Sequence, residues 1–392
     1  MDLNYSDDQL MLRESAERFL RDKYSFEHFR KVEAAGEGFG EGTWSAFAEL
    51  GWLGLPLSEA HGGLGAGAVE AAIVCESLGN ALVLEPYIPA VVLCGGLIDR
   101  LGTRAQCDEL LGPLIEGRGW ACLAHQERTT GDDLGHVGAT AAKEGSGYVL
   151  DGAKTMVLGG ARASTFLVSA RVAGEDPQGR IGVFIVSAQT KGVTVTTFRT
   201  VDGGRAADVT FANVRVGQAA LLGDSEDASA ALSLAFDSAA AAMCWDAVGA
   251  MDALLSATVA FTKQRVQFGK PLSSFQALQH RMAEMAVKCT EARASALLAS
   301  LSLNAPQETR ARGVSGAKAK IGRISRLVAQ EAIQLHGAMG FSDEFPVGWW
   351  FKRLFMFEAI LGTTAQHLDR YRKLVINPCI QAESLLRAPT VA

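Results

Sequence analysis

The sequence predicts an α+β protein in which a helical segment, a β segment and a second helical segment follow one another. Apolar residues recur at helical spacing over residues 1–120, and short apolar stretches separated by glycines follow over residues 121–222. Long helical patterns return over residues 223–392. Because 392 residues exceed the usual size of one domain, we expect these three segments to be separate domains.

The N-terminal segment predicts four helices. The first covers residues 6–24, where Ser6 is a suitable N-cap and is followed by an acidic first turn. A short helix after residue 43 should end near Gly51, before a loop rich in glycine. Residues 68–82 and 103–117 predict the other two helices.

The middle segment predicts a small antiparallel, barrel-like β domain. Asp151-Gly152 lies between two apolar stretches and indicates a hairpin. Four further strands are expected at residues 164–172, 181–188, 192–198 and 206–216.

The C-terminal segment predicts a four-helix bundle. Its helical patterns cover residues 228–265, 274–301, 308–337 and 363–376, and most exceed the mean length of helices in globular proteins.

Composition excludes several classes of function. The net charge of -6 disfavours a nucleic-acid-binding protein. Seven cysteines without a C-x-x-C pair argue against a disulfide framework and a zinc site, so we expect no metal. The acidic N-terminal segment does not resemble a signal peptide, and the apolar run at 239–251 is too short to span a bilayer. We therefore expect a cytoplasmic enzyme, or a subunit of one, without a membrane partner.

Two motifs of the C-terminal segment carry a resemblance to a known family. The first is R-x-Q-F-G at residues 265–269, followed by S-F-Q at 274–276, and the second is Q-x-x-G-x-x-G at 334–340. Together with the order of the segments, they make the whole chain resemble the acyl-CoA dehydrogenase family. The resemblance implies the family's fold and a tetramer in which a neighbouring subunit completes each FAD site.

The resemblance also implies which residues contact FAD. Arg265, a bidentate donor suited to phosphate, is expected at the diphosphate, beside Gln267 and Phe268. The second motif implies Gln334, His336 and Gly337 on the other side of the dinucleotide, and the G-T-x-x-Q phrase implies Thr363. The alternative is an exposed arginine at a helix end, with Phe268 packed under the turn.

The family's reaction is α,β-dehydrogenation of an acyl-CoA, in which a carboxylate removes the α-proton. Most members have that glutamate directly before a Gly-Thr pair, where this chain has Leu361. The main candidate base is Asp246, which we expect to be buried because it interrupts an apolar run. Alternatively, Asp246 pairs with a cation across the bundle, such as Arg281 or Lys288. Glu358 is the second candidate base.

The β segment departs from the family pattern as well. Only Glu127 and Asp132 or Asp133 match the family's flavin loop, and Met156 and Leu158 stand where a Trp and a Thr usually contact the flavin. These departures favour an α2β2 heterotetramer with a better-preserved subunit over a homotetramer.

The resemblance further implies an electron-transfer flavoprotein as electron acceptor. Relatives that act on pimeloyl-CoA or steroid side chains favour a dicarboxylyl or ring-bearing acyl-CoA substrate. Two other functions stay open: a non-catalytic subunit that completes a partner's FAD site, and a flavin oxygenase or desulfinase on the same scaffold.

Overall fold

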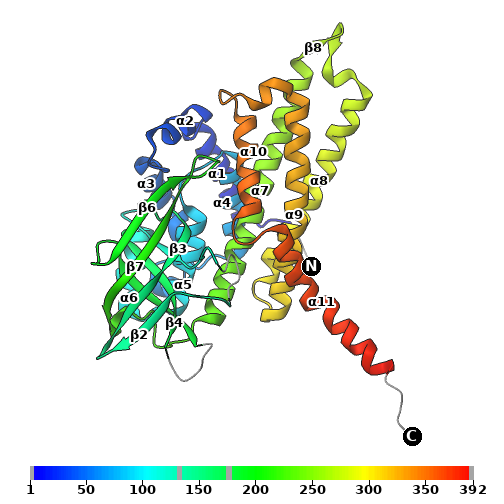
Figure 1. The fold of residues 1–392 in the computed structure, drawn as a ribbon. Helices are drawn as coiled ribbons and strands as arrows, with labels where there is room; N and C mark the ends of the chain where they lie inside the picture. The colour runs from blue at the N-terminus through cyan, green and yellow to red at the C-terminus, as the bar shows by residue number, and fades with distance from the viewer. Residues whose placement is uncertain (1–3, 130–134, 174–178, 388–392) are drawn as a thin grey trace. The chain divides into compact units, whose positions relative to one another are not determined.

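The computed structural model describes residues 4–129, 135–173 and 179–387. The chain forms two compact units. The first unit comprises Met1–Ser77 with Ala81–Ala239, and the second comprises Leu78–Asn80 with Ala240–Ala392. The expected order of helices, sheet and helices is confirmed (Figure 1).

The helices before the sheet follow the sequence signals closely. Ser6 caps the first helix, and Gln9 completes a capping box with it. Gly51 takes a left-handed conformation just after the third helix, as expected for a helix stop. Three helical elements of this segment were not predicted: α2, a π-helix at Ile88–Gly95 and α5. The α-helices are α1 (Asp7–Lys23), α2 (Phe26–Ala35), α3 (Glu41–Glu49), α4 (Ala68–Asn80), α5 (Gly96–Leu101) and α6 (Arg104–Ile115).

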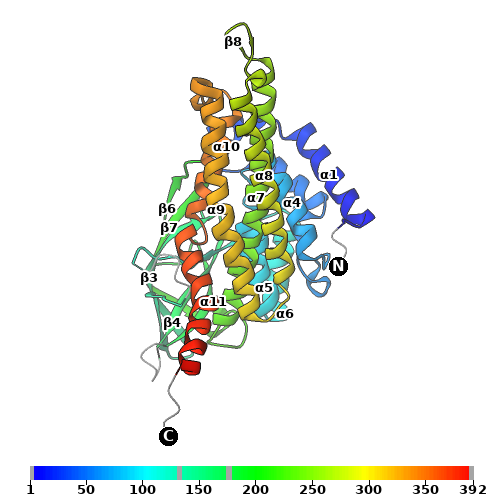
Figure 2. The ribbon, with the colours of Figure 1, turned by 90° about the vertical axis from the view of Figure 1, so that its right-hand side faces the viewer.

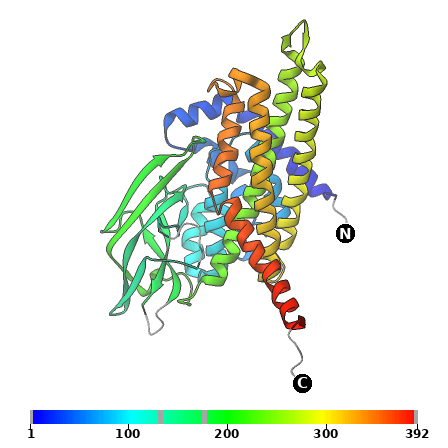
Figure 3. The same cartoon turned by 45° about the vertical axis from the view of Figure 1, so that its right-hand side comes forward.

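The middle of the chain forms one seven-stranded sheet, visible in Figure 3. Its strands are β1 (Ala121–Ala124), β2 (Thr140–Glu144), β3 (Gly147–Leu158), β4 (Thr165–Val172), β5 (Arg180–Ser187), β6 (Val193–Arg199) and β7 (Arg205–Gly217). The order is β1-β4-β2-β3-β7-β6, with β5 paired to β4. Most pairs are antiparallel, as expected, but β4 runs parallel to β1 and to β2.

The hairpin predicted at Asp151-Gly152 is wrong. Both residues lie inside β3, and the turn between β2 and β3 falls at residues 145–146. The register against β7 shifts between Leu150 and Gly152, so the dipeptide marks a β-bulge. A Cβ on Gly152 would lie 2.5 Å from the Ala139 side chain, which explains the glycine by close approach.

The second unit is built from long helices that run side by side, as Figure 2 shows. They are α7 (Ser229–Gln264), whose first eleven residues belong to the first unit, α8 (Gln276–Ser302), α9 (Gln307–His336), α10 (Pro346–Ala359) and α11 (Thr364–Arg387). The short strands β8 (Val266–Gln267) and β9 (Lys270–Pro271) join α7 to α8. Helix α10 was not predicted, and its Trp349 is buried.

Helix α7 is longer than the apolar run that the sequence marks as too short for a bilayer. Among the described residues it is the one helix whose length and composition would allow it to cross a membrane. Its most apolar window is 56% buried within the protein. That burial is typical of the core helix of a bundle.

Candidate active site

The two sequence motifs meet at one end of the helical bundle. Phe261 precedes the first motif on α7, and its ring stacks on His336 of the second motif with centroids 4.5 Å apart. The β8–β9 hairpin extends from this end, where α7 and α8 are joined (Figure 1). The structure therefore brings together two residues, Phe261 and His336, that lie 75 positions apart in the sequence.

The first motif forms a tight hairpin with an unusual turn residue. Phe268 and Gly269 occupy the two turn positions, and both have positive φ, 54° and 77°. A turn with two positive φ values favours Asn or Gly, so a phenylalanine is strained there. The Phe268 side chain is 89% exposed, and Arg265 and Gln267 are exposed as well. Phe268 is thus not packed under the turn.

The second motif forms the end of α9 and a following 3-10 turn. Gln334 and Gly337 are exposed, whereas His336 is buried. Burial lowers the pKa of His336, and its Nδ1 lies 2.8 Å from the Ala332 carbonyl oxygen. His336 is therefore a packing residue of this end. Among the described residues no cluster of three His, Cys, Asp or Glu side chains could hold a metal ion.

Asp246 is buried, as expected, and it is held in an ion pair. Arg353 of α10 donates from Nε to Oδ1 at 2.9 Å and from Nη2 to Oδ2 at 2.6 Å. The cation across the bundle is therefore Arg353. Arg281 instead pairs with Glu331, and Lys288 with Glu291. Both carboxylate oxygens of Asp246 are therefore engaged by the Arg353 guanidinium in a two-point pair.

Glu358 binds the first residue of α11, Thr364, through both of its carboxylate oxygens. Its Oε1 accepts from the Thr364 amide at 3.0 Å, and its Oε2 accepts from the Thr364 hydroxyl at 2.5 Å. These contacts satisfy a helix N-terminus, as a capping side chain does. Each oxygen of both candidate bases thus accepts a hydrogen bond from this chain.

Leu361 lies in a turn between α10 and α11 that carries two positive φ values, 55° at Leu361 and 95° at Gly362. The buried Lys318 donates to the carbonyl oxygen of Gly362 at 3.0 Å. Thr363 follows directly and is half-buried. Gly337 precedes α10 in the sequence and Thr363 follows it. The 14 residues of α10, about 20 Å of helix, therefore separate Thr363 from the end of the bundle that carries the two motifs.

In the β sheet, Glu127 is a buried structural residue. It accepts from Lys154 Nζ at 2.6 Å and from the amides of Gly138 and Ala139 at 2.9 Å. Burial lowers the pKa of Lys154 to about 8 although Glu127 opposes the shift. The other residues of the expected flavin loop, Asp132 and Asp133, lie outside the described residues.

Met156 stands at a strained point of β3. Its φ is 54°, and its amide donates to Asp208 Oδ1 at 3.2 Å. The register against β7 shifts between Lys154 and Val157, so the backbone bulges here. Bulges re-aim side chains near functional sites, but neither Met156 nor Leu158 can donate a side-chain hydrogen bond.

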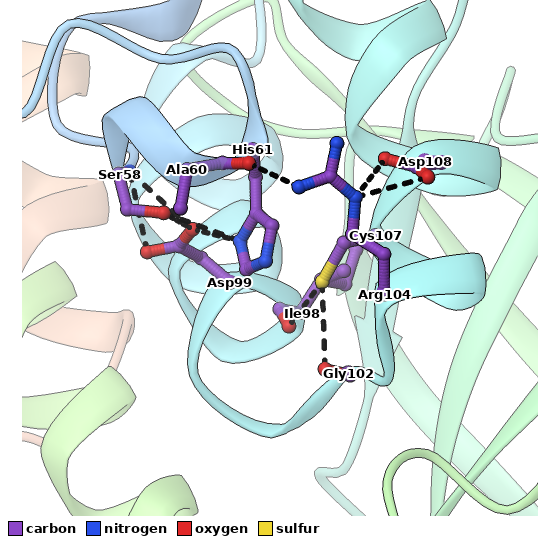
Figure 4. Close-up of polar contacts among 9 residues, drawn as sticks. All are labelled: Ser58, Ala60, His61, Ile98, Asp99, Gly102, Arg104, Cys107 and Asp108. Atoms are coloured by element: carbon purple, nitrogen blue, oxygen red, sulfur yellow. Dashed lines mark hydrogen bonds and ion pairs between the residues drawn. The ribbon is translucent and has the colours of Figure 1, made fainter.

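A polar cluster outside the expected site joins the glycine-rich loop to α5 (Figure 4). Asp99 Oδ1 accepts from the Ser58 hydroxyl at 2.6 Å and lies 2.8 Å from His61 Nδ1. Ser58 Oγ lies 3.2 Å from the same Nδ1. Because one ring nitrogen faces both partners, His61 cannot relay a proton from Ser58 to Asp99 through its two nitrogens, and the cluster is not a hydrolase triad.

Comparison with known proteins shows the family. Three family models match: the N-terminal domain of acyl-CoA dehydrogenases at residues 6–118, the middle domain at 122–214 and the C-terminal domain at 229–375. The probable acyl-CoA dehydrogenase YngJ of Bacillus subtilis is 31% identical over 354 residues, covering 88% of this chain and 92% of its own length. The chain therefore belongs to the acyl-CoA dehydrogenase family, oxidoreductases that act on the CH–CH bond of acyl-CoA thioesters and bind FAD.

Solved structures give the same fold. Butyryl-CoA dehydrogenase from Megasphaera elsdenii superposes with a TM-score of 0.88 at 25% identity, covering 96% of this chain and all of the other. A variant of the Tcur3481–Tcur3483 steroid acyl-CoA dehydrogenase superposes with a TM-score of 0.85 at 27% identity, covering 95% and 99%.

The exposed residues of the motif end fit FAD chemically. Arg265 offers a guanidinium that can bind two phosphate oxygens, and Gln267 and Gln334 offer amides. Phe268 offers an apolar face that its own unit leaves largely uncovered. Sequence reasoning missed Arg353, because no local signal links it to an aspartate 107 positions earlier.

Proposed function

We propose that this chain takes part in FAD-dependent α,β-desaturation of an acyl-CoA as one subunit of an oligomer with shared FAD sites. Helix α7 carries this proposal because it is continuous from Ser229 to Gln264. Asp246 and Arg265 are 19 positions apart, or about 28 Å along an unbroken helix. The mid-helix position of Asp246 faces this chain's own acyl-CoA site, so Arg265 at the end of the same helix serves a different FAD.

Each residue of the motif end has a defined task in this proposal. Arg265 binds the diphosphate of the neighbouring subunit's FAD, and Gln267 and Gln334 hydrogen-bond along the dinucleotide. Phe268 covers an apolar face of the cofactor, and this contact offsets the strain of its turn. When bound, FAD accepts the β-hydride, while Thr363 contacts the FAD of this chain's own site.

We further propose that the oligomer is an α2β2 heterotetramer with a second acyl-CoA dehydrogenase subunit, which supplies the base. Leu361 cannot accept a proton, and the oxygens of Asp246 and Glu358 are engaged by Arg353 and Thr364. The steroid acyl-CoA dehydrogenase above is named for two chains, which supports this assembly. By the same likeness, the substrate is a ring-bearing or dicarboxylyl acyl-CoA. Electrons leave to an electron-transfer flavoprotein in the cytoplasm.

A single substitution tests the shared FAD site. Arg265→Met removes the diphosphate donor and should weaken FAD binding to the assembled oligomer by at least about tenfold, because charge-assisted hydrogen bonds are lost. Lys263→Met is the matched control, since Lys263 is another exposed cation at the same helix end. Equal FAD affinity in the two variants, measured by fluorescence titration, would contradict the proposal.

A second candidate function is a self-sufficient enzyme with Asp246 as its base. The burial of this carboxylate within an apolar helix favours it. For catalysis, Arg353 must then release at least one oxygen when substrate binds.

Charge neutralisation distinguishes the two functions. Asp246→Asn removes the buried charge that faces Arg353, whereas the double variant Asp246→Asn/Arg353→Met removes both charges of the pair. If the pair is structural, the double variant recovers both stability and turnover relative to the single one. If Asp246 is the base, the double variant recovers stability and stays inactive.

A further inference from the structure

Lys318 of α9 is a charged side chain placed almost entirely inside the bundle. Its residue is 1% exposed, and its ammonium donates to the carbonyl oxygens of Phe357 at 2.6 Å and Gly362 at 3.0 Å. It also lies 3.9 Å from the centroid of the Phe357 ring. Burying an ammonium costs free energy unless good partners compensate. The partners here include a carbonyl group in the last turn of α10, at Phe357, and one in the turn that follows, at Gly362.

That turn, residues 360–363, has a conformation that its sequence does not favour. Leu361 has a φ of 55°, and for a bulky side chain the left-handed region is a rare and strained conformation. Gly362 follows with a φ of 95°. Such strain persists only where surrounding contacts hold the backbone.

Helix α9 supplies further contacts that hold the turn. His367 Nε2 lies 2.7 Å from the Leu361 carbonyl oxygen, and its Nδ1 lies 3.3 Å from Ser315 Oγ on α9. A Cβ at Gly322 would lie 2.1 Å from the Thr364 hydroxyl, so the chain after the turn packs directly on α9. Ser315, Lys318 and Gly322 follow one another at spacings of three and four, on one face of the helix.

We infer that Lys318 is a positioning residue that holds the turn at 360–363 in the conformation that presents Thr363 to FAD. This inference rests on the proposed contact between Thr363 and FAD. Lys318 itself does not touch the cofactor. It fixes the carbonyl groups on either side of Leu361 and so determines where the next residue points.

The first test measures the turn itself, without reference to FAD. In the assembled oligomer, Lys318→Met should raise amide hydrogen exchange of peptides covering residues 360–364 by about tenfold or more, because the turn then opens more readily. Lys320→Met is the matched control, since that lysine is half-exposed on the same helix and lies 3.7 Å from Glu291. Equal exchange in the turn of both variants would overturn the inference.

The second test measures coupling between Lys318 and the strained residue. Leu361→Gly removes the strain, so Lys318→Met should weaken FAD binding about tenfold in the wild-type background and clearly less in the Leu361→Gly background. A loss of the same size in both backgrounds would overturn the inference. If Lys318→Met does not fold, Lys318→Arg replaces it, because a longer, planar cation cannot reproduce both bonds.

The two tests separate this inference from the proposed function. A wild-type oligomer that binds no FAD contradicts the proposed function, while hydrogen exchange still decides whether Lys318 holds the turn. Faster exchange with unchanged FAD affinity overturns the positioning role, because the turn would then be mobile without consequence for the cofactor.

Discussion

Two of the ion pairs in the described part of the chain are largely buried. Lys154 pairs with Glu127 in the sheet, and Arg353 pairs with Asp246 in the bundle. Each pair joins residues that are distant in the sequence. Removing one partner of such a pair is strongly destabilising, because the other charge stays buried.

Glu127→Gln should therefore lower the free energy of unfolding by about 3 kcal/mol at neutral pH, since Lys154 loses its charged partner. Glu17→Gln, which breaks the exposed pair with Arg13, should cost well under about 1 kcal/mol. Denaturant unfolding of both variants checks the difference. A similar midpoint for the two would show that the buried pair contributes little.

Glu127 also predicts a pH dependence. Burial raises its pKa, but the bonds from Lys154 and from the amides of Ala139 and Gly138 outweigh burial and leave the pKa below 4.5. Between that lowered pKa and 4.5 the unfolded chain binds more protons, so stability from this group falls as pH falls through the window. The difference in unfolding free energy between wild type and Glu127→Gln should shrink on acidification from about pH 5. A difference in unfolding free energy that stays constant with pH would contradict this role of Glu127.

At the scale of elements, strongly periodic helices were predictable and irregular ones were not. The signals for α1 and α7–α9 are local: a capping serine, apolar spacing and a closing glycine. Helix α10 was missed because its aromatic residues leave no clear periodicity. The Asp151-Gly152 bulge was mistaken for a hairpin because both features favour the same dipeptide, and only the pairing with β7 distinguishes them.

The candidate site also has features that the sequence predicts and features that it does not. The two motifs could be read from the sequence, whereas the partners of Asp246 and Glu358 could not. Both partners, Arg353 and Thr364, are fixed by tertiary packing rather than by a local pattern.

The β8–β9 hairpin predicts a conflict between stability and assembly. Phe268→Gly relieves the positive φ and should stabilise the isolated chain by up to about 1 kcal/mol, or leave it unchanged. The same change should weaken oligomer formation and FAD binding, because the exposed ring is lost. Thermal unfolding and sedimentation measure the two effects separately. Unchanged assembly would show that Phe268 makes no contact with a neighbour.

The end of α4 packs closely on α7, and this packing predicts that a larger residue at Gly79 destabilises the protein. A Cβ at Gly79 would lie 1.9 Å from the Asp246 carbonyl oxygen, so Gly79→Ala should destabilise the protein by about 2 kcal/mol or more. At Gly112 of α6 an added Cβ meets nothing within 4 Å, so Gly112→Ala should be neutral or stabilising by up to about 1 kcal/mol. Chemical denaturation measures the stability of both variants. Equal effects of Gly79→Ala and Gly112→Ala would contradict close packing at Gly79.

At the scale of the whole molecule, the exposed residues proposed to bind FAD and the hydrogen-bonded oxygens of both candidate bases lead to the same proposal, a subunit that needs a partner. The chain offers Arg265, Gln267, Phe268 and Gln334 outwards, and its own turn at position 361 carries a leucine. Both features are expected of a subunit that completes a partner's site and depends on that partner for the base.

The most direct measurement is the flavin content of the chain purified alone, compared with the chain co-purified with a second acyl-CoA dehydrogenase subunit. The absorption spectrum and the flavin released per chain give the stoichiometry. We predict well under one FAD per chain for the protein alone, and flavin that acyl-CoA bleaches only in the complex. One FAD per chain with bleaching by substrate in the protein alone would contradict the heteromeric account and support a homotetramer with its own base.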